Sequence, residues 1–331
     1  MSQANPFHTV HDLTGAFIVS RCLHVVADLG VADALDEQPR TAAELAMLVN
    51  AHPDALGRVM SLLSAHGVFE ARNGAFCHSP ASRLLLSDHP QSMRDFVRVF
   101  GLPFQWRTYE SFAHTVRTGQ PAAQYLYSDG YWAYLQENPA ERDIFNAAMR
   151  AKSYAQVAGV VRSYDFAGCG VIGDIGAGLG HLLCALLDAN PDAQGILFEL
   201  PEVIAQVGHL ASDRLALQSG DFFVDELPAC DVYVLMEIIH DWDDAKALEI
   251  LRSVRAAAPP DAKLLLIEQT IPDDPGPDWS KVLDIHMMAM LGGLQRSQEQ
   301  YGTLLQQAGF ELVREIDTGT DISILESAPV S

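Results

Sequence analysis

The chain has 331 residues, 49% hydrophobic and 19% charged, a composition that can bury enough apolar surface to fold and that argues against global disorder. Its 21 basic and 43 acidic residues leave a net charge of −22, which disfavours nucleic acids and anionic membranes as partners. No apolar stretch reaches the roughly 20 residues of a spanning helix. The start of the chain holds no basic segment before an apolar block, so no secretory signal is expected and the cytoplasm is the default location.

Residues 8–100 are expected to form a first domain of short helices followed by a hairpin. Apolar residues recur there at helical spacing, and the first pattern ends at Gly30, a common helix stop. Asn73-Gly74 then joins two strand-like runs, the strongest short hairpin signal. Helices followed by a hairpin are typical of a winged helix, which would also suit a DNA-binding regulator. Residues 41–66, where a recognition helix would lie, contain only Arg58 as a firm cation, so DNA binding is disfavoured.

The rest of the chain is expected to form connecting helices and then an α/β domain. Residues 101–165 are aromatic and helical. Within residues 166–331, four strand-like runs alternate with helix-length segments, which predicts a parallel sheet covered by helices on both faces. The runs FELVREID and DISILES near the end, separated by a Thr-Gly-Thr turn, predict a terminal antiparallel hairpin.

A glycine-rich turn after the first strand of this domain predicts a nucleotide-type site. Gly176, Gly178 and Gly180 let the backbone turn tightly and approach a ligand closely. Glu199 ends the next strand, where its carboxylate can accept both hydroxyls of a ribose; an exposed strand-end acid is the plainer reading. Dinucleotide and sulfonium-nucleoside sites share these features. The third glycine comes one place too early for the dinucleotide fingerprint, which favours the second kind of site.

Two further groups are candidates at the same sheet edge. Asp221 and Phe222 offer an acceptor for an exocyclic amine beside a ring for a purine, although a turn with core aromatics would look the same. His240 follows a parallel strand and Glu268 ends the next, so the two side chains should meet at the carboxyl edge, where ligands bind. If the substrate is a phenol-like hydroxyl with a pKa near 10, proton transfer to an imidazole with a pKa of about 6.5 is uphill by roughly 5 kcal/mol. A carboxylate on the far nitrogen of the ring would stabilise the imidazolium that forms.

The order and spacing of these motifs resembles the S-adenosylmethionine-dependent O-methyltransferases, the group of plant phenylpropanoid enzymes and bacterial tailoring enzymes of aromatic secondary metabolism. The likeness covers nearly the whole chain and rests on DIGAGLG, FELP, GDFF, IIHDWDD, LLLIEQTIP, MLGG-x-x-R and LLQQAGF. It implies a Rossmann-like methyltransferase domain with a parallel sheet and a C-terminal antiparallel hairpin. It also implies a preceding all-helical, winged-helix-like dimerisation domain, and therefore a homodimer.

The resemblance also implies roles for individual residues. S-adenosyl-L-methionine is the expected cofactor, with Gly176 at its methionine moiety, Glu199 at the ribose, and Asp221 with Phe222 at the adenine. His240 matches the catalytic base and Glu268 the first of two glutamates that flank it. A small aromatic acceptor is expected. The candidate substrate contacts are Phe145, Met149, Asp284 and Met288.

This sequence departs from the family pattern at two positions. Met236 replaces a lysine that plant enzymes carry four places before the histidine, so one cofactor contact must be made otherwise. Gln295 stands where the second glutamate is expected; it can hydrogen-bond His240 but cannot stabilise the imidazolium by charge. A non-methylating relative, such as a hydroxylase, decarboxylase or cyclisation catalyst, therefore stays open as an alternative.

Cysteines and metals play no part in the expected chemistry. The five cysteines have no metal-ligand spacing, and their odd number argues against a complete disulfide framework, so reduced and mostly buried thiols are expected. No cluster of metal-ligating residues is recognisable, so no metal is expected. Further aromatic and methionine residues can line a pocket or simply pack in the core; they are Trp106, Tyr154, His286 and Met287.

Overall fold

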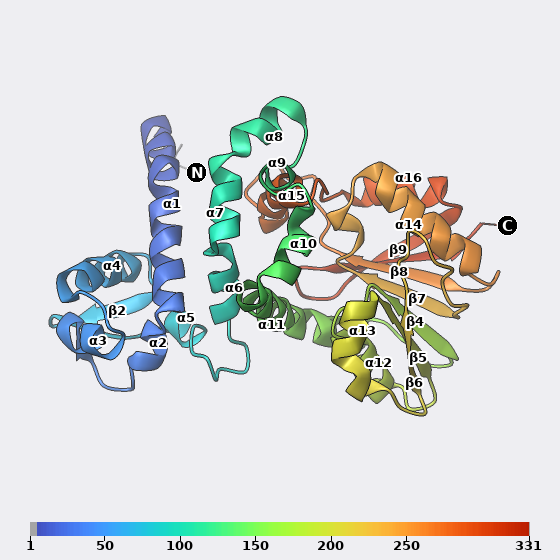
Figure 1. The fold of residues 1–331 in the computed structure, drawn as a ribbon, viewed down its shortest axis with the longest axis horizontal. Helices are drawn as coiled ribbons and strands as arrows, with labels where there is room; N and C mark the ends of the chain where they lie inside the picture. Colours follow the sequence, from blue (N-terminus) through green and yellow to red (C-terminus); the bar gives the residue numbers. More distant parts are fainter. Residues whose placement is uncertain (1–4, 331) are drawn as a thin grey trace. The chain divides into compact units, whose positions relative to one another are not determined.

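The computed structural model describes residues 5–330 and divides into two compact units (Figure 1). The first comprises residues 5–107 and 133–152, and the second comprises residues 108–132 and 153–330.

The first unit begins with helices and a small sheet. Its opening helix, α1 (Pro6–Asp28), starts eight positions before the apolar pattern that predicted it and ends before Gly30, which has a left-handed φ of 67°. The other elements up to residue 83 are α2 (Val31–Ala34), β1 (Arg40–Thr41), α3 (Ala42–Leu48), α4 (Pro53–Ala65), β2 (Phe69–Arg72), β3 (Ala75–His78) and α5 (Pro80–Arg83). Strands β2 and β3 pair antiparallel around Asn73 and Gly74, whose φ values are 51° and 79°, so the predicted hairpin is confirmed. Strand β1 adds to β3 as a third strand.

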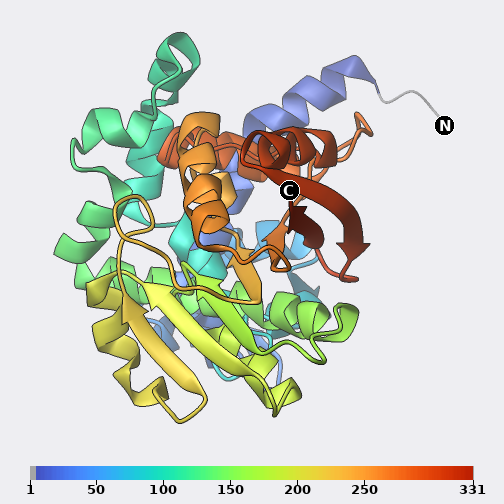
Figure 2. The same ribbon diagram turned by 90° about the vertical axis from the view of Figure 1, so that its right-hand side faces the viewer.

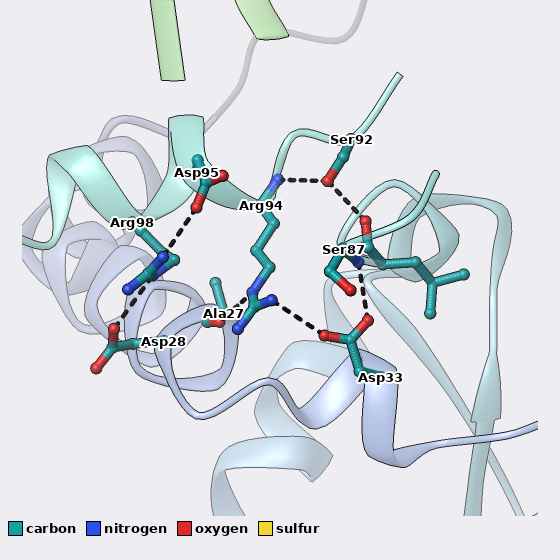
Figure 3. Close-up of polar contacts among 9 residues, drawn as sticks. Ala27, Asp28, Asp33, Ser87, Ser92, Arg94, Asp95 and Arg98 are labelled. Carbon is teal, nitrogen blue, oxygen red and sulfur yellow. Dashed lines mark hydrogen bonds and ion pairs between the residues drawn. The ribbon is translucent and has the colours of Figure 1, made fainter. Parts of the chain in front are cut away.

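Polar contacts tie α6 (Arg94–Phe100) to the start of this unit (Figure 3). Arg94 donates from Nε to the carbonyl of Ala27, 3.1 Å away, and forms an ion pair with Asp33 at 3.1 Å. Asp33 also accepts from the amide of Ser87 at 2.8 Å. One arginine therefore satisfies a carbonyl near the end of α1 and links α6 to an acid within α2.

The remaining helices before the large sheet connect the two units along the chain. They are α7 (Pro103–Glu110), α8 (Phe112–Thr118), α9 (Ala122–Leu126), α10 (Gly130–Glu137) and α11 (Pro139–Ser163). The expected helical character of residues 101–165 is thus present. The division between units falls within α7, α10 and α11.

The second unit is built on a seven-stranded sheet with the order β6-β5-β4-β7-β8-β10-β9 (Figure 2). Its strands are β4 (Val171–Ile175), β5 (Gln194–Glu199), β6 (Leu215–Ser219), β7 (Val232–Met236), β8 (Lys263–Glu268), β9 (Phe310–Asp317) and β10 (Ser323–Pro329). The first five are parallel, and β10 pairs antiparallel with both β8 and β9. The predicted parallel sheet and terminal hairpin are confirmed, whereas the edge strand β6 was not predicted.

Alternating side chains of the strands enter two apolar clusters on opposite faces of this sheet. Leu264 and Leu266 of β8 pack with α14 (Asp244–Ala257) and α16 (Gln298–Gln307). Leu265 and Ile267 pack with the end of α11, α12 (His181–Ala189) and α13 (Pro201–Val207). The remaining elements are the 3-10 turns η1 (Gly208–Leu210) and η2 (Ile239–Asp241) and helix α15 (Trp279–Met290). Helices cover both faces, so polar side chains gather at the carboxyl ends of the parallel strands.

Candidate active site

The glycine-rich turn after β4 requires glycine for two physical reasons. Gly176, Gly178 and Gly180 all have positive φ values, of 74°, 52° and 77°, which side chains disfavour. A Cβ on Gly176 would also lie 2.7 Å from Cδ1 of Ile238, in the segment that follows β7. The turn therefore lies directly beside the start of the His240 segment.

Glu199 lies at this turn, as its spacing predicted. Its Oε2 accepts from the Gly178 amide at 3.0 Å and its Oε1 from the Leu200 amide at 2.7 Å. Burial raises the pKa of Glu199, and these two amide hydrogen bonds act against that rise. The carboxylate is thus oriented by backbone groups, and its expected contact with a ribose stays a prediction.

Asp174, one residue before the end of β4, is a site residue that sequence patterns did not identify. It is 2% exposed, and its Oδ2 has no hydrogen-bond partner among the residues that the structure describes. Burial, together with the charge of Glu199, raises the pKa of Asp174 to about 7. The signal was available, because an acid inside the apolar run VIGDI is unusual in a strand buried on both faces.

Phe222 also borders the glycine turn. Its Cε1 lies 3.7 Å from the position that a Cβ on Gly176 would take, and its ring packs edge-on to Phe223 with centroids 4.8 Å apart. Asp221 accepts from the Phe223 amide at 2.9 Å. Met236, the last residue of β7, is half-buried against the apolar cluster that includes α12. Gly176, Glu199 and Phe222 therefore lie around one turn.

His240 is buried in the turn η2 and meets three polar side chains. Its Nδ1 lies 2.8 Å from Nε2 of Gln295 and 3.4 Å from Oε2 of Glu268, while its Nε2 lies 3.3 Å from Oδ1 of Asp241. Glu268 is fully buried and accepts from the Ile239 amide at 2.8 Å. The structure thus brings together His240, Glu268 and Gln295 as the sequence predicted, and it adds Asp241.

The charges around His240 favour its protonated form. Burial alone would lower the pKa of His240, but Glu268 and Asp241 outweigh it and raise that pKa to about 9. Burial raises the pKa of Glu268 to about 7, and the neighbouring imidazole opposes this rise. His240 therefore holds its proton more tightly than in water because of the neighbouring carboxylates, and Glu268 does so because it is buried.

The amide of Gln295 has an orientation that matters for the imidazole. Its Nε2 faces Nδ1 of His240, whereas its Oε1 is buried without a partner among the described residues. A 180° rotation of the amide would let Oε1 accept a proton from Nδ1–H. With its proton on Nδ1, a neutral imidazole has the lone pair of Nε2 available as a base.

The candidate substrate residues fall in different places. In the second unit, Asp284 accepts from the Gln295 amide at 2.9 Å, and Met288 is half-buried on the same helix, α15. In the first unit, Phe145 and Met149 pack against a small apolar cluster around Leu102. Asp284 therefore supports Gln295 through its backbone, and a role for any of the four in binding substrate stays a prediction.

Of the further pocket candidates, two are buried and one is exposed. His286 is 9% exposed, and its Nδ1 lies 2.8 Å from the hydroxyl of Tyr109. Met287 is also buried, whereas Tyr154 is exposed. Trp106 carries the guanidinium of Arg21 over its ring, 5.1 Å from the centroid. These contacts agree with ordinary packing and add no group to the His240 site.

Residues 5–330 hold neither a group of side chains suited to a metal ion nor a helix suited to span a membrane. Within that range, no three or more His, Cys, Asp or Glu side chains are grouped so that they could hold a metal ion. None of the helices in the same range is both long and apolar enough to cross a membrane.

Comparison with known proteins yields two family models and several relatives. The O-methyltransferase domain matches residues 109–311, and the O-methyltransferase dimerisation domain matches residues 11–88. Phenazine O-methyltransferase PhzM of Lysobacter antibioticus is 37% identical over 324 residues, covering 96% of this chain and 94% of the relative. Mitomycin biosynthesis 6-O-methyltransferase of Streptomyces lavendulae is 34% identical and covers 94% and 91%. The 8-amino-8-demethylriboflavin N,N-dimethyltransferase of Streptomyces davaonensis is also 34% identical and covers 95% and 92%.

Solved structures agree with these matches. The crystal structure of LaPhzM superimposes with a TM-score of 0.90 at 36% identity, covering 99% of this chain and 100% of that chain. The O-methyltransferase NcsB1 from neocarzinostatin biosynthesis, in complex with S-adenosylmethionine and 2-hydroxy-5-methyl naphthoic acid, gives a TM-score of 0.80 at 31% identity, with coverage of 94% and 96%. The expected methyltransferase fold is confirmed, and the chain belongs to the family of S-adenosylmethionine-dependent O-methyltransferases.

Proposed function

We propose that this chain transfers a methyl group from S-adenosyl-L-methionine to a hydroxyl of a small aromatic molecule, with His240 as the general base. One observation carries the proposal: a buried imidazole, set against Glu268 and Gln295, stands at the same sheet edge as the glycine turn of β4. When bound, S-adenosylmethionine supplies a methyl group on a positively charged sulfur.

The residues at the glycine turn fit this cofactor. A Cβ at Gly178 would have nothing within 4 Å, so the backbone of the turn is open to close approach there, and the Oδ2 of Asp174, unpartnered among the described residues, suits a ligand that brings hydrogen-bond donors or positive charge. Gly176 would hold the methionine part, Glu199 the ribose, and Asp221 with Phe222 the adenine. Met236 would make only apolar contact with the cofactor. The neighbouring acids would therefore be the groups that interact with the charge of the bound cofactor.

His240 has the properties that removal of a phenolic proton needs. Glu268 and Asp241 raise the pKa of His240 toward that of a phenol, so proton transfer from a phenol to this imidazole is less uphill than transfer to an imidazole in water. The imidazole loses its own proton more readily when a cation lies beside it. Glu268 then stabilises the imidazolium that forms as the acceptor oxygen is deprotonated.

The names of the relatives support an aromatic acceptor, and they leave two kinds of acceptor atom, oxygen and nitrogen. Phenazine and mitomycin appear in the names of O-methylating relatives, and the NcsB1 complex contains a naphthoic acid. The second candidate is an aromatic amine, because an N,N-dimethyltransferase is 34% identical to this chain, the same identity as the mitomycin enzyme. Incubation with methyl-labelled cofactor and a panel of hydroxyphenazines, naphthols and arylamines, followed by mass spectrometry, separates these candidates. A product with no added methyl would favour a non-methylating relative.

His240→Ala tests the assignment of the base. We expect turnover of the acceptor found in the panel to fall by about 10² or more, because general-base help is lost, while calorimetry still detects S-adenosylhomocysteine binding. His209→Ala, which alters an exposed histidine of the same unit, is the matched control and should leave turnover unchanged. Normal turnover in His240→Ala would refute the base assignment.

A homodimer through the first unit completes the proposal. Helix α1 exposes an apolar series at helical spacing, formed by Phe7, Val10, Leu13 and Phe17, each at least 60% exposed. The dimerisation-domain match over residues 11–88 supports the same assignment. Sedimentation at micromolar concentration should report a dimer, and Leu13→Asp should shift it toward monomer; a wild-type monomer would contradict this proposal.

A further inference from the structure

The segment Gly293–Arg296 lies directly against the turn that carries His240. A Cβ on Gly293 would lie 2.1 Å from the carbonyl oxygen of His240 and 2.7 Å from that of Asp241. Distances this short leave no space for any side chain. Gly293 therefore fixes the approach of the segment to the backbone of His240 itself.

Arg296 donates hydrogen bonds to the same turn on both sides of His240. Its Nη1 donates to the carbonyl of Ile239 at 3.1 Å, and its Nη2 donates to the carbonyl of Trp242 at 3.0 Å. These carbonyls belong to residues on either side of His240. Its Nε and Nη2 also donate to Oδ1 of Asp244, at 2.9 and 2.8 Å, which joins the turn to the start of α14. One planar guanidinium thus ties together the whole stretch from residue 239 to residue 244.

A stabilising ion pair alone does not account for this arrangement. Arg296 is 1% exposed, whereas the side chain of Asp244 is 75% exposed. Burying a guanidinium costs free energy that a solvated partner repays poorly, and an apolar side chain could fill the volume. What the guanidinium provides is directional donors for carbonyls that flank His240. The adjacent residue, Gln295, is at the same time placed with its amide on the imidazole.

We propose that Arg296 and Gly293 are positioning residues for His240, which hold its turn so that the imidazole faces Gln295 and Glu268. This inference rests on the proposed role of His240 as base. Neither residue contacts the reacting groups, so both act through the placement of the ring. A misplacement of about 1 Å can cost about 10²-fold in rate, so a loosened turn should have a measurable effect.

The primary test needs no acceptor. The ring nitrogens of His240, identified by their loss in His240→Ala, are titrated by ¹⁵N NMR in the full-length protein. Arg296→Lys keeps the charge but loses the planar fork, and it should shift the His240 titration by about half a unit or more toward the value of a free imidazole. Arg255→Lys is the matched control, because Arg255 also donates to two carbonyls, of Gly309 and Val330. An unchanged His240 titration in Arg296→Lys would overturn the proposal.

A double-mutant cycle adds a kinetic test, which uses the acceptor that the panel of hydroxyphenazines, naphthols and arylamines yields. Arg296→Lys should lower kcat by about tenfold or more in the wild-type background and by less than about threefold in the His240→Ala background, since it acts through the ring. Equal losses in both backgrounds would show a merely structural role. Asp244→Asn, which keeps Arg296 but removes the charge of its exposed carboxylate partner, repeats the cycle if Arg296→Lys no longer binds S-adenosylhomocysteine. The His240→Ala single variant judges the proposed base separately, because its normal turnover would refute that role while the titration still judges Arg296.

Discussion

Two buried glutamates on neighbouring strands of the same sheet differ in how well they are partnered. Glu326 of β10 accepts from the hydroxyl of Tyr164 at 2.8 Å and from Nε of Arg314 at 2.6 Å, and Nζ of Lys263 lies 3.3 Å away. Glu268 of β8 accepts the Ile239 amide on Oε1, while its Oε2 has no hydrogen-bond partner among the described residues and lies 3.4 Å from Nδ1 of His240. Both side chains are hidden from solvent, at 6% and 0% exposed, but Glu326 lies near the surface, where its partners Arg314 and Lys263 are 60% and 49% exposed, whereas Glu268 lies in the interior.

Their pKa shifts have opposite signs. Burial raises the pKa of Glu326, but the hydrogen bonds from Arg314, Tyr164 and Lys263 outweigh it, so its pKa is lowered. Glu326 therefore stabilises the fold above the usual glutamate pKa, and this contribution is lost as pH falls below it. The pKa of Glu268 is raised to about 7, so the stability linked to its proton is present below the usual value and is lost as pH rises through 7.

The difference separates a carboxylate that stabilises the fold, Glu326, from one that is available to a reacting group, Glu268. Three donors already compensate the negative charge of Glu326, so this carboxylate is not available to stabilise a positive charge that forms only during a reaction. Glu268 is held at its other oxygen and left incompletely satisfied at the one facing His240, which is the arrangement expected beside a group that gains a proton during reaction. The same substitution at the two positions should therefore separate stability from activity.

Glu326→Gln should have the largest effect on stability. Loss of the carboxylate removes charge-assisted hydrogen bonds, each worth roughly 1.5–3 kcal/mol, and urea denaturation should register a loss of about that size in the free energy of unfolding. Turnover should stay at the wild-type level. Arg314→Ala is a useful companion, because that side chain is 60% exposed and its loss should cost less than the loss of the Glu326 carboxylate. Unchanged stability in Glu326→Gln would remove the contrast between the two glutamates.

Glu268→Gln should lower kcat by roughly 10- to 100-fold, because the imidazolium loses the buried one of its two neighbouring carboxylates, while the urea midpoint stays close to wild type. The pH profile gives a second measurement. The reaction needs neutral His240, so kcat/KM rises with pH; without Glu268 the pKa of His240 falls, and the acidic limb should move to lower pH. Glu326→Gln should leave that limb in place. A limb that moves in both variants, or in neither, would contradict the comparison.

Much of the fold was predictable because its strong signals are local. The sheet strands around Gly176, His240 and Glu268 are short apolar runs, and Asn73-Gly74 forms the predicted hairpin. Strand β6 was missed because LALQS is a short edge strand with only one buried residue, so it lacks an apolar run. Helix α1 was predicted too short, because the expected pattern began at Thr14, whereas the helix begins at Pro6 after an Asn5 N-cap and its first turns bury no residue.

The site was predicted in part, for a different reason. His240 and Glu268 end neighbouring parallel strands, and strand ends meet at one sheet edge, so their contact followed from topology. Gln295 was placed by family resemblance alone. The hydrogen bonds from Arg296 to the carbonyls of Ile239 and Trp242 were not predictable, because they depend on the path of the loop that carries Arg296, more than 50 residues along the chain. The buried, unpartnered state of Asp174 likewise appears only once the sheet is assembled.

The glycine pair at 292 and 293 also limits how this protein can be redesigned. Gly292 has a φ of 80°, and a Cβ there would lie 2.9 Å from Cγ of Pro121, while Gly293 has no free volume at all. A mutagenic library that seeks new acceptors should therefore leave both positions untouched. Diversity is better introduced at Leu291 and Leu294, which are only half-buried and border the same loop.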